Sequence, residues 1–208
     1  MKLKNKIDIN KEKKKNGLLA AAYELFTTIG FANTTITQIA RKANVGKGTF
    51  YLYFKDKYEI RDALITIKSG EIFQEAMNRL NDYCKKTSEV MSVSDRIIFI
   101  TDYIITILSK DISLLQYISK YLSWGVYSTP VFQTDGKHEL VDFRTYIKQM
   151  LKKDGISFKN PEITIFTIVE LINSTCYTVI LQGEPVTLSE YKPYLFQCIN
   201  LIINDAIE

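Results

Sequence analysis

The sequence predicts an all-α protein of two domains, and three observations carry that prediction. Only four of its 208 residues are proline and nine are glycine, a composition that permits long helices. Apolar residues recur at spacings of three and four along most of the chain, as they do on the buried face of a helix. Residues that start or stop helices separate these periodic stretches.

The N-terminal region is strongly basic. Residues 1–57 carry 12 lysine and arginine residues against four acidic ones, and seven of the lysines lie within residues 1–15. The rest of the chain carries 15 basic and 19 acidic residues. We interpret residues 1–15 as a flexible basic arm. Such a charge run is usually a solvated segment, but beside the motif described next it favours a polyanion as partner.

The first two predicted helices follow this arm. The apolar side of the first helix consists of Leu18, Ala22, Leu25, Phe26 and Ile29. Gly30 stands where a left-handed residue commonly ends a helix. Thr35 and Gln38 are three residues apart, a capping-box pattern that predicts the start of the second helix. That helix is short and ends near Ala43.

A tight turn joins the second helix to a third. Within residues 44–46, Asn44 tolerates the left-handed conformation and Gly46 is acceptable as an N-cap. The third helix runs from about Lys47 to Phe54, with aromatic residues four apart on its buried side. Two short helices joined in this way are typical of a helix-turn-helix, whose second helix enters the major groove of DNA. The alternative is a buried helix hairpin with exposed tyrosines; the basic arm and the turn favour DNA.

A longer stretch carries a family resemblance: "AAAYELFTTIGFANTTITQIARKANVGKGTFYLYFKDKYEIRDAL". From about Leu18 to Leu64 it resembles the DNA-binding domain of the TetR/AcrR family of transcriptional regulators. The resemblance covers about a quarter of the chain. It implies a DNA-binding domain at 16–60, with its motif at about 35–54, and a ligand-binding and dimerisation domain at 61–208.

The resemblance also implies which residues contact DNA. The family's contacts correspond to Thr35, Thr37, Lys47, Gly48, Thr49, Tyr51, Tyr53 and Lys57. The two threonines and Tyr51 correspond to residues near phosphate, and residues 47–49 to the exposed front of the recognition helix. Tyr53 corresponds to a residue that contacts a base or phosphate, and Lys57 to a lysine at the start of the next helix, where its charge can meet a phosphate. Leu52 departs from the family pattern, which is often polar or aromatic there, and is suited to a thymine methyl group.

Apolar periodicity predicts further helices in the rest of the chain, at about 57–86, 95–109, 111–128, 135–154, 163–181 and 187–207. Tyr117, Tyr121 and Trp124 share one helical stripe, which indicates either ordinary core or the wall of a ligand cavity between helices. For the second interpretation we expect four ligand-contacting residues: Tyr103, Tyr121, Trp124 and Tyr177. A flat or hydrophobic molecule would suit such a cavity.

The last two predicted helices are the most apolar. Residues 163–181 are long enough to span a membrane, but Glu170 and Asn173 make them a poor span. We therefore expect no membrane partner and an antiparallel hairpin that packs against a second subunit. The family dimerises in this way, and the residues expected at the interface are Leu195, Ile199 and Ile202.

The remaining chemistry excludes most other functions. The single histidine, His138, has no neighbours at metal-ligand spacing, and the three cysteines form no CxxC pair, so we expect no metal and no cofactor. No catalytic motif is present, so we expect no enzyme. No apolar segment follows the N-terminal lysines as in a signal peptide, which favours the cytoplasm.

We expect a homodimeric repressor that a small hydrophobic or aromatic molecule releases from a near-palindromic operator. The alternative is a constitutive or architectural DNA-binding protein of the same fold without a ligand.

Overall fold

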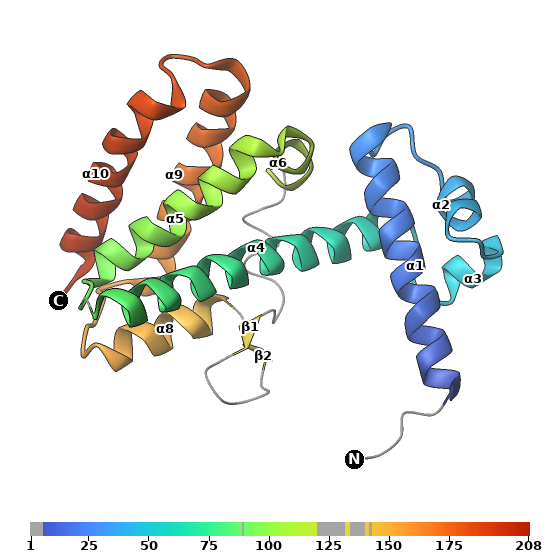
Figure 1. The fold of residues 1–208 in the computed structure, drawn as a ribbon, viewed down its shortest axis with the longest axis horizontal. Coiled ribbons are helices and arrows are strands. Elements are labelled where there is room, and N and C mark those ends of the chain that lie inside the picture. Colours follow the sequence, from blue (N-terminus) through green and yellow to red (C-terminus); the bar gives the residue numbers. More distant parts are fainter. Residues whose placement is uncertain (1–5, 89, 120–131, 134–139, 142) are drawn as a thin grey trace. The chain divides into compact units, whose positions relative to one another are not determined.

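The computed structural model describes residues 6–88, 90–119, 132–133, 140–141 and 143–208 (Figure 1). The described elements are almost all helices, which confirms the predicted all-α class. The chain divides into two compact units, Met1–Ile65 and Thr66–Glu208. The division falls within one helix, α4 (Lys57–Thr87).

The first unit is a small helical domain. It consists of α1 (Lys6–Thr28), α2 (Ile36–Lys42), α3 (Lys47–Tyr51) and the start of α4. α1 packs against α2, and α2 against α3. The core includes Leu18, Ala22, Phe26, Ile39, Phe50 and Ile60. Thr34, the buried polar residue of this core, donates a hydrogen bond from its hydroxyl to the carbonyl of Gly30 at 2.8 Å.

The lysine-rich segment before this core differs from the prediction. Residues 6–15, which we interpreted as part of a flexible arm, belong to α1. Lysine and glutamate are good helix formers, and Asp8 in the first turn suits the positive end of the helix dipole. The described residues of this segment, 8–15, are all exposed, so their charges face solvent.

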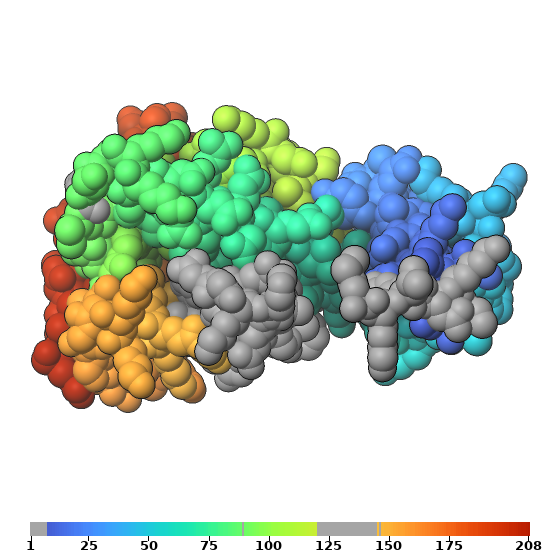
Figure 2. All heavy atoms as spheres, turned by 60° about the horizontal axis from the view of Figure 1, so that its bottom comes forward, coloured from blue at the N-terminus to red at the C-terminus, as the bar shows by residue number. Residues whose placement is uncertain are grey.

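The second unit carries the longer helices. They are α5 (Val93–Lys110), α6 (Ile112–Ile118), α8 (Phe143–Lys153), α9 (Pro161–Gln182) and α10 (Leu188–Ala206). Two short strands, β1 (Phe132–Gln133) and β2 (Leu140–Val141), pair antiparallel. Within the predicted helix at 135–154, Leu140 and Val141 are extended and the helix begins at Phe143, whereas residues 135–139 lie outside the described residues. α8 lies at the surface of this unit, seen in orange in Figure 2.

α9 and α10 form the expected helical hairpin (Figure 1). α9 ends at Gly183, whose left-handed φ of 67° and hydrogen bond to the Val179 carbonyl close the last turn. α10 begins with a capping box between Thr187 and Glu190. These hydrogen bonds hold the pKa of Glu190 below its usual value. α10 also packs on α5, where Lys192 pairs with Asp102 at 2.7 Å.

α9 is an unusually apolar helix. Among the described residues it is long and apolar enough to cross a membrane, judged by length and composition alone. Only 28% of this apolar window is buried within the chain, so much of its surface stays uncovered. The uncovered apolar surface of α9 is therefore available to a partner.

Candidate nucleic-acid interface and ligand cavity

A capping box starts the helix-turn-helix. The Thr35 hydroxyl accepts a hydrogen bond from the backbone N–H of Gln38 at 3.2 Å, and the Gln38 side chain accepts one from the Thr35 backbone at 2.8 Å. This arrangement satisfies two of the donors that a helix start leaves unpaired. It confirms the start of the second helix predicted from the sequence.

The turn has the expected backbone. α2 ends at Lys42, and Asn44 adopts a left-handed φ of 54°. Val45 closes the turn through a hydrogen bond from its N–H to the Ala40 carbonyl at 2.9 Å. Gly46 is the N-cap of α3 and makes no side-chain capping bond. The turn therefore brings the first residue of α3, Lys47, directly beside the end of α2.

α3 is anchored by aromatic rings. Phe50 is 0% exposed and Phe54 4%, and their ring centroids lie 5.8 Å apart. The regular helix ends at Tyr51, earlier than predicted, although the N–H of Phe54 still donates to the Phe50 carbonyl at 3.0 Å. These two rings fix which side of α3 is buried.

The opposite side of α3 is open. Tyr51 is 50% exposed and Leu52 80%. Lys47 and Gly48 are also exposed, whereas Thr49 and Tyr53 are half-buried. A side-chain carbon added at Gly48 would meet no atom within 4 Å, so nothing in the described chain requires a glycine there. Close approach of a partner is a remaining reason for a glycine in a helix.

Lys57 takes a different place from the one expected. Its ammonium donates hydrogen bonds to the carbonyls of Phe31 at 2.8 Å, Ala32 at 3.4 Å and Thr34 at 2.9 Å. It also lies 4.4 Å from the centroid of the Phe31 ring. An ammonium has three N–H donors. Lys57 therefore joins the start of α4 to the loop before α2, and its three donors are already engaged by carbonyls.

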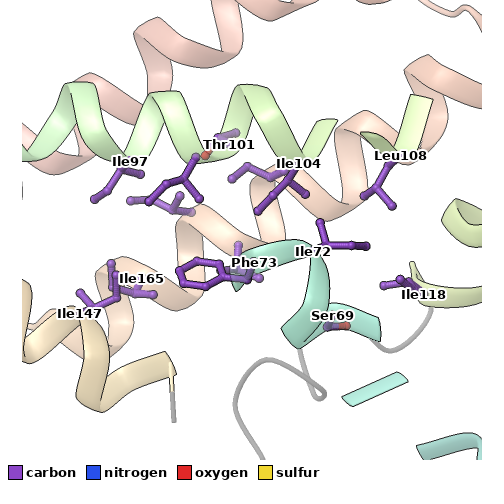
Figure 3. Close-up of a pocket in the computed structure, with 14 residues that line it drawn as sticks. Ser69, Ile72, Phe73, Ile97, Thr101, Ile104, Leu108, Ile118, Ile147 and Ile165 are labelled. Atoms are coloured by element: carbon purple, nitrogen blue, oxygen red, sulfur yellow. The ribbon is translucent and has the colours of Figure 1, made fainter. Parts of the chain in front are cut away.

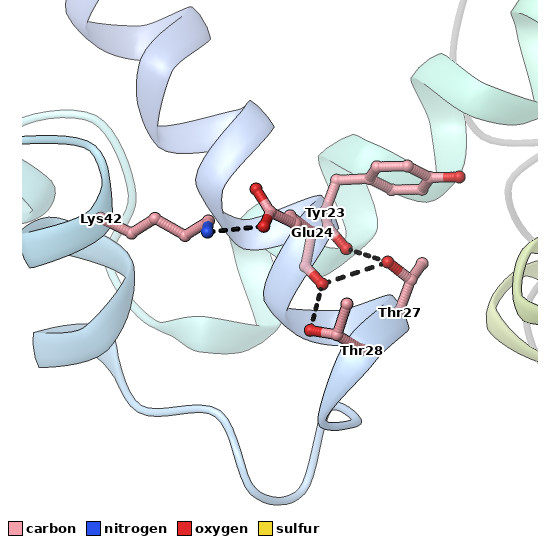
Figure 4. A network of polar contacts seen from close by, with 5 residues as sticks. All are labelled: Tyr23, Glu24, Thr27, Thr28 and Lys42. Atoms are coloured by element: carbon pink, nitrogen blue, oxygen red, sulfur yellow. Dashed lines mark hydrogen bonds and ion pairs between the residues drawn. The ribbon is translucent and has the colours of Figure 1, made fainter.

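Sequence reasoning missed a basic residue at this surface. A hollow between α2 and α3 is lined by Thr37, Arg41, Asn44 and Lys47, together with Ala40, Val45 and Gly46. Arg41 is exposed, whereas its neighbour Lys42 pairs with Glu24 of α1 at 2.6 Å (Figure 4). The position of Arg41 in the last turn of α2 was the signal available in the sequence.

The second unit contains an apolar cavity of about 90 Å³ (Figure 3). α4 contributes Ser69, Ile72 and Phe73, and α5 faces them with Thr101 and four aliphatic residues. The lining consists of Ser69, Ile72, Phe73, Ile97, Ile100, Thr101, Ile104, Leu108, Ile118, Ile147, Ile165, Ile168, Val169 and Ile172. A cavity thus lies where a ligand site was expected.

Among the described residues, Phe73 is the one aromatic side chain in a wall that is otherwise almost entirely aliphatic, which corrects two of the four expected contacts. Neither Tyr103 nor Tyr177 lines the cavity, and Tyr121 and Trp124 lie outside the described residues. The α5 lining residues 97, 100, 101, 104 and 108 share one helical face, and Tyr103 lies on another. Its hydroxyl bonds Glu75 at 2.5 Å, and this bond raises the pKa of Tyr103.

Comparisons with known proteins agree with this geometry. The family model described as "Bacterial regulatory proteins, tetR family" matches residues 18–64. The HTH-type transcriptional regulator YhgD of Bacillus subtilis (strain 168) is 43% identical over 63 residues, which cover 30% of this chain and 33% of YhgD. An HTH-type transcriptional regulator of Staphylococcus aureus (strain USA300) is 24% identical over 174 residues, which cover 84% of this chain and 85% of that protein.

Solved structures extend the likeness to the whole fold. FadR from Thermus thermophilus aligns with a TM-score of 0.60 at 14% identity, covering 89% of this chain and 93% of that one. The fatty acid degradation regulator FadR from Bacillus halodurans aligns at 0.56 with 16% identity, covering 95% and 96%. At these identities the likeness establishes the fold alone. The family model matched over residues 18–64, the similar regulator of Staphylococcus aureus and the helix-turn-helix geometry identify the chain as a member of the TetR family of bacterial regulatory proteins, which are DNA-binding transcriptional regulators and not enzymes.

Proposed function

We propose that the protein is a cytoplasmic homodimeric repressor, released from a near-palindromic DNA operator by a small hydrophobic molecule. The exposed side of α3 provides the surface that would enter the major groove. Lys47 and Arg41 offer charges for phosphates, and Thr37, Thr49, Tyr51 and Tyr53 offer hydroxyl groups. Thr35 lies at the same edge, but its hydroxyl already caps α2. Leu52, at 80% exposure, is the apolar group available to a thymine methyl.

Gly48 is the single observation that carries the DNA proposal. It lies exposed in a helix, with open space around it and no left-handed φ. Glycine in a helix costs up to about 1 kcal/mol relative to alanine. No contact in the described chain explains this cost in stability. The missing side chain would, however, let a DNA backbone or base edge approach α3 closely.

The test replaces Gly48 with alanine. Gly48→Ala should raise the free energy of unfolding by up to about 1 kcal/mol and weaken binding to duplex DNA from the protein's own promoter region. Gly17→Ala is the matched control, because Gly17 is also helical with open space around it. It should stabilise the fold and leave DNA affinity unchanged. If Gly48→Ala binds this DNA as tightly as the wild type, the proposed orientation of α3 is wrong.

The dimer would use a different set of residues from the one expected. Leu195 and Ile199 are 0% exposed inside the protomer's own core, so neither is available to a partner. Ile202 is half-buried and packs against that same core. The hairpin instead leaves four large apolar side chains exposed: Ile163 and Phe166 of α9, and Tyr194 and Leu201 of α10. We propose that a second copy covers them.

The ligand would be hydrophobic, as the aliphatic cavity favours. FadR from Bacillus subtilis and FadR from Thermus thermophilus have been solved in complex with stearoyl-CoA and lauroyl-CoA, respectively. An alkyl chain is therefore a ligand type that this fold accommodates in other proteins. Such a ligand would act by preferring the conformation that binds DNA poorly. A compound that occupies the cavity without changing DNA affinity would favour the constitutive alternative.

A further inference from the structure

We propose that the cavity binds the aliphatic part of a neutral molecule and that the Ser69 hydroxyl is its hydrogen-bonding partner. This inference rests on the proposed function, because it names the chemistry of the regulator's effector. It is carried by two independent observations. One is the composition of the cavity wall, and the other is the state of the Ser69 side chain.

The described part of the wall contains no charged side chain. Its 14 residues are aliphatic except for Phe73, Ser69 and Thr101. A charged group brought into such a space would lose its hydration and find no opposite charge. The part of a ligand that enters must therefore be neutral and mostly hydrocarbon. At about 90 Å³ the cavity is smaller than the roughly 300–1,000 Å³ typical of whole-ligand pockets, so it suits a small molecule or one end of a longer one.

Ser69 is a buried hydroxyl without a partner. It is 6% exposed, and among the described residues its Oγ finds no hydrogen bond. Helical threonines elsewhere in the unit donate to the carbonyl four residues earlier, as Thr164 does to Asn160 and Thr175 to Leu171. Ser69 makes no such bond in α4. A buried hydroxyl that lacks a partner destabilises the empty protein, and a ligand oxygen would remove that cost.

The location of Ser69 separates it from other unpaired groups. Ser119 Oγ is also buried without a partner, but Ser119 does not line the cavity. Thr101 lines the cavity from α5, across from α4 (Figure 3). Among the described residues, Ser69 alone combines an unpaired buried oxygen with a place in the wall. A hydroxyl or carbonyl oxygen next to the alkyl part of a ligand would give the Ser69 hydroxyl the hydrogen-bond partner that it lacks.

The experiment compares two small probes of similar shape. These are 1-butanol and n-pentane, in which a methyl group replaces the hydroxyl. Each is titrated into full-length protein carrying labelled isoleucine methyl groups, followed by NMR. Many of these methyl groups line the cavity, so their shifts report both location and affinity. We expect both probes to shift the resonances of Ile72, Ile104 and Ile168.

The variant Ser69→Ala then isolates the hydroxyl. It should bind 1-butanol roughly three- to tenfold more weakly and bind n-pentane as the wild type does. Removing an unsatisfied hydroxyl should not unfold the protein, so weaker binding cannot be attributed to lost structure. Ser119→Ala is the matched control and should bind both probes normally. The proposal is overturned if 1-butanol leaves the cavity methyl groups unshifted, or if Ser69→Ala affects the two probes equally or not at all.

DNA binding, measured on the same samples, keeps this inference distinct from the proposed function. If 1-butanol fills the cavity with the Ser69 dependence but no cavity ligand changes DNA affinity, the site stands and the proposed regulation fails. If another compound releases DNA while 1-butanol does not enter the cavity, the regulation stands and this assignment fails.

Discussion

The two units differ in where their unpaired polar groups lie. In the first unit, buried or half-buried polar groups such as Thr34 and Lys57 bond to backbone carbonyls, and polar groups for a partner lie on the surface. In the described part of the second unit, the unpaired hydroxyl of Ser69 lies inside, in the wall of the apolar cavity. A surface that binds DNA can stay hydrated until its partner arrives. The proposed ligand site instead offers an apolar space and, among the described residues, one unpaired hydroxyl before any ligand binds.

The largest expected change in stability distinguishes a buried residue of α10 from an exposed residue of the same helix. Ile199→Asp should unfold it, costing more than the roughly 2–5 kcal/mol of truncating a buried isoleucine, because an unpaired charge is buried as well. Leu201→Asp, on the same helix, should leave the protomer folded and disrupt the dimer, since Leu201 is 63% exposed. Circular dichroism reports folding and light scattering the mass. A dimeric, stable Leu201→Asp protein would remove α10 from the proposed interface.

The next effect concerns the first unit. Lys57→Ala removes a charged donor from three carbonyls and should cost about 1.5–3 kcal/mol of unfolding free energy. Lys55→Ala, nearby and exposed, is the control and should change stability by less than about 0.5 kcal/mol. Chemical denaturation measures both variants. Equal stability of the two would mean that Lys57 is free to contact phosphate after all.

A smaller effect distinguishes two threonines that the sequence assigned the same role. Thr35→Ala loses the capping box of α2 and should cost about 1 kcal/mol of stability. Thr37→Ala has no cap to lose and should weaken DNA binding at nearly unchanged stability. Thermal unfolding and DNA titration of both variants test this division. It would be refuted if Thr37→Ala proved the less stable protein.

The smallest effect is a pH dependence in the second unit. Burial raises the pKa of the Cys176 thiol from 9.0 to about 11. The neutral thiol is thus favoured in the folded state, and stability is lost as pH rises from the unfolded value towards the folded one. Between pH 7.5 and 9.5 the loss should stay below about 1 kcal/mol. This loss of stability should vanish in Cys176→Ala and persist in Cys198→Ala, measured by chemical denaturation at each pH. The same pH profile of stability in the wild type and both variants would contradict the assignment to Cys176.

Sequence reasoning succeeded where one residue determines local geometry. Thr35 and Gln38 predicted a helix start, and Asn44 and Gly46 predicted the turn, because capping and left-handed backbone depend on single side chains. It failed where position depends on packing. Periodicity indicates that Ile199 and Leu201 lie on different faces of α10, but not which face meets the protomer's own core. Lys57 likewise looks like a surface charge until the chain places three carbonyls around it.

The space around Gly48 has a consequence for how this protein can change over generations. A β-carbon added there meets no atom of the described chain within 4 Å, so a small side chain needs no compensating change elsewhere in the first unit. Gly30, with its φ of 84°, lacks this freedom, because its backbone conformation disfavours other residues. If α3 enters the major groove as proposed, mutation at position 48 would change DNA binding while the folded population is maintained. A duplicated copy of the gene could acquire a new set of target promoters before it acquired any structural defect.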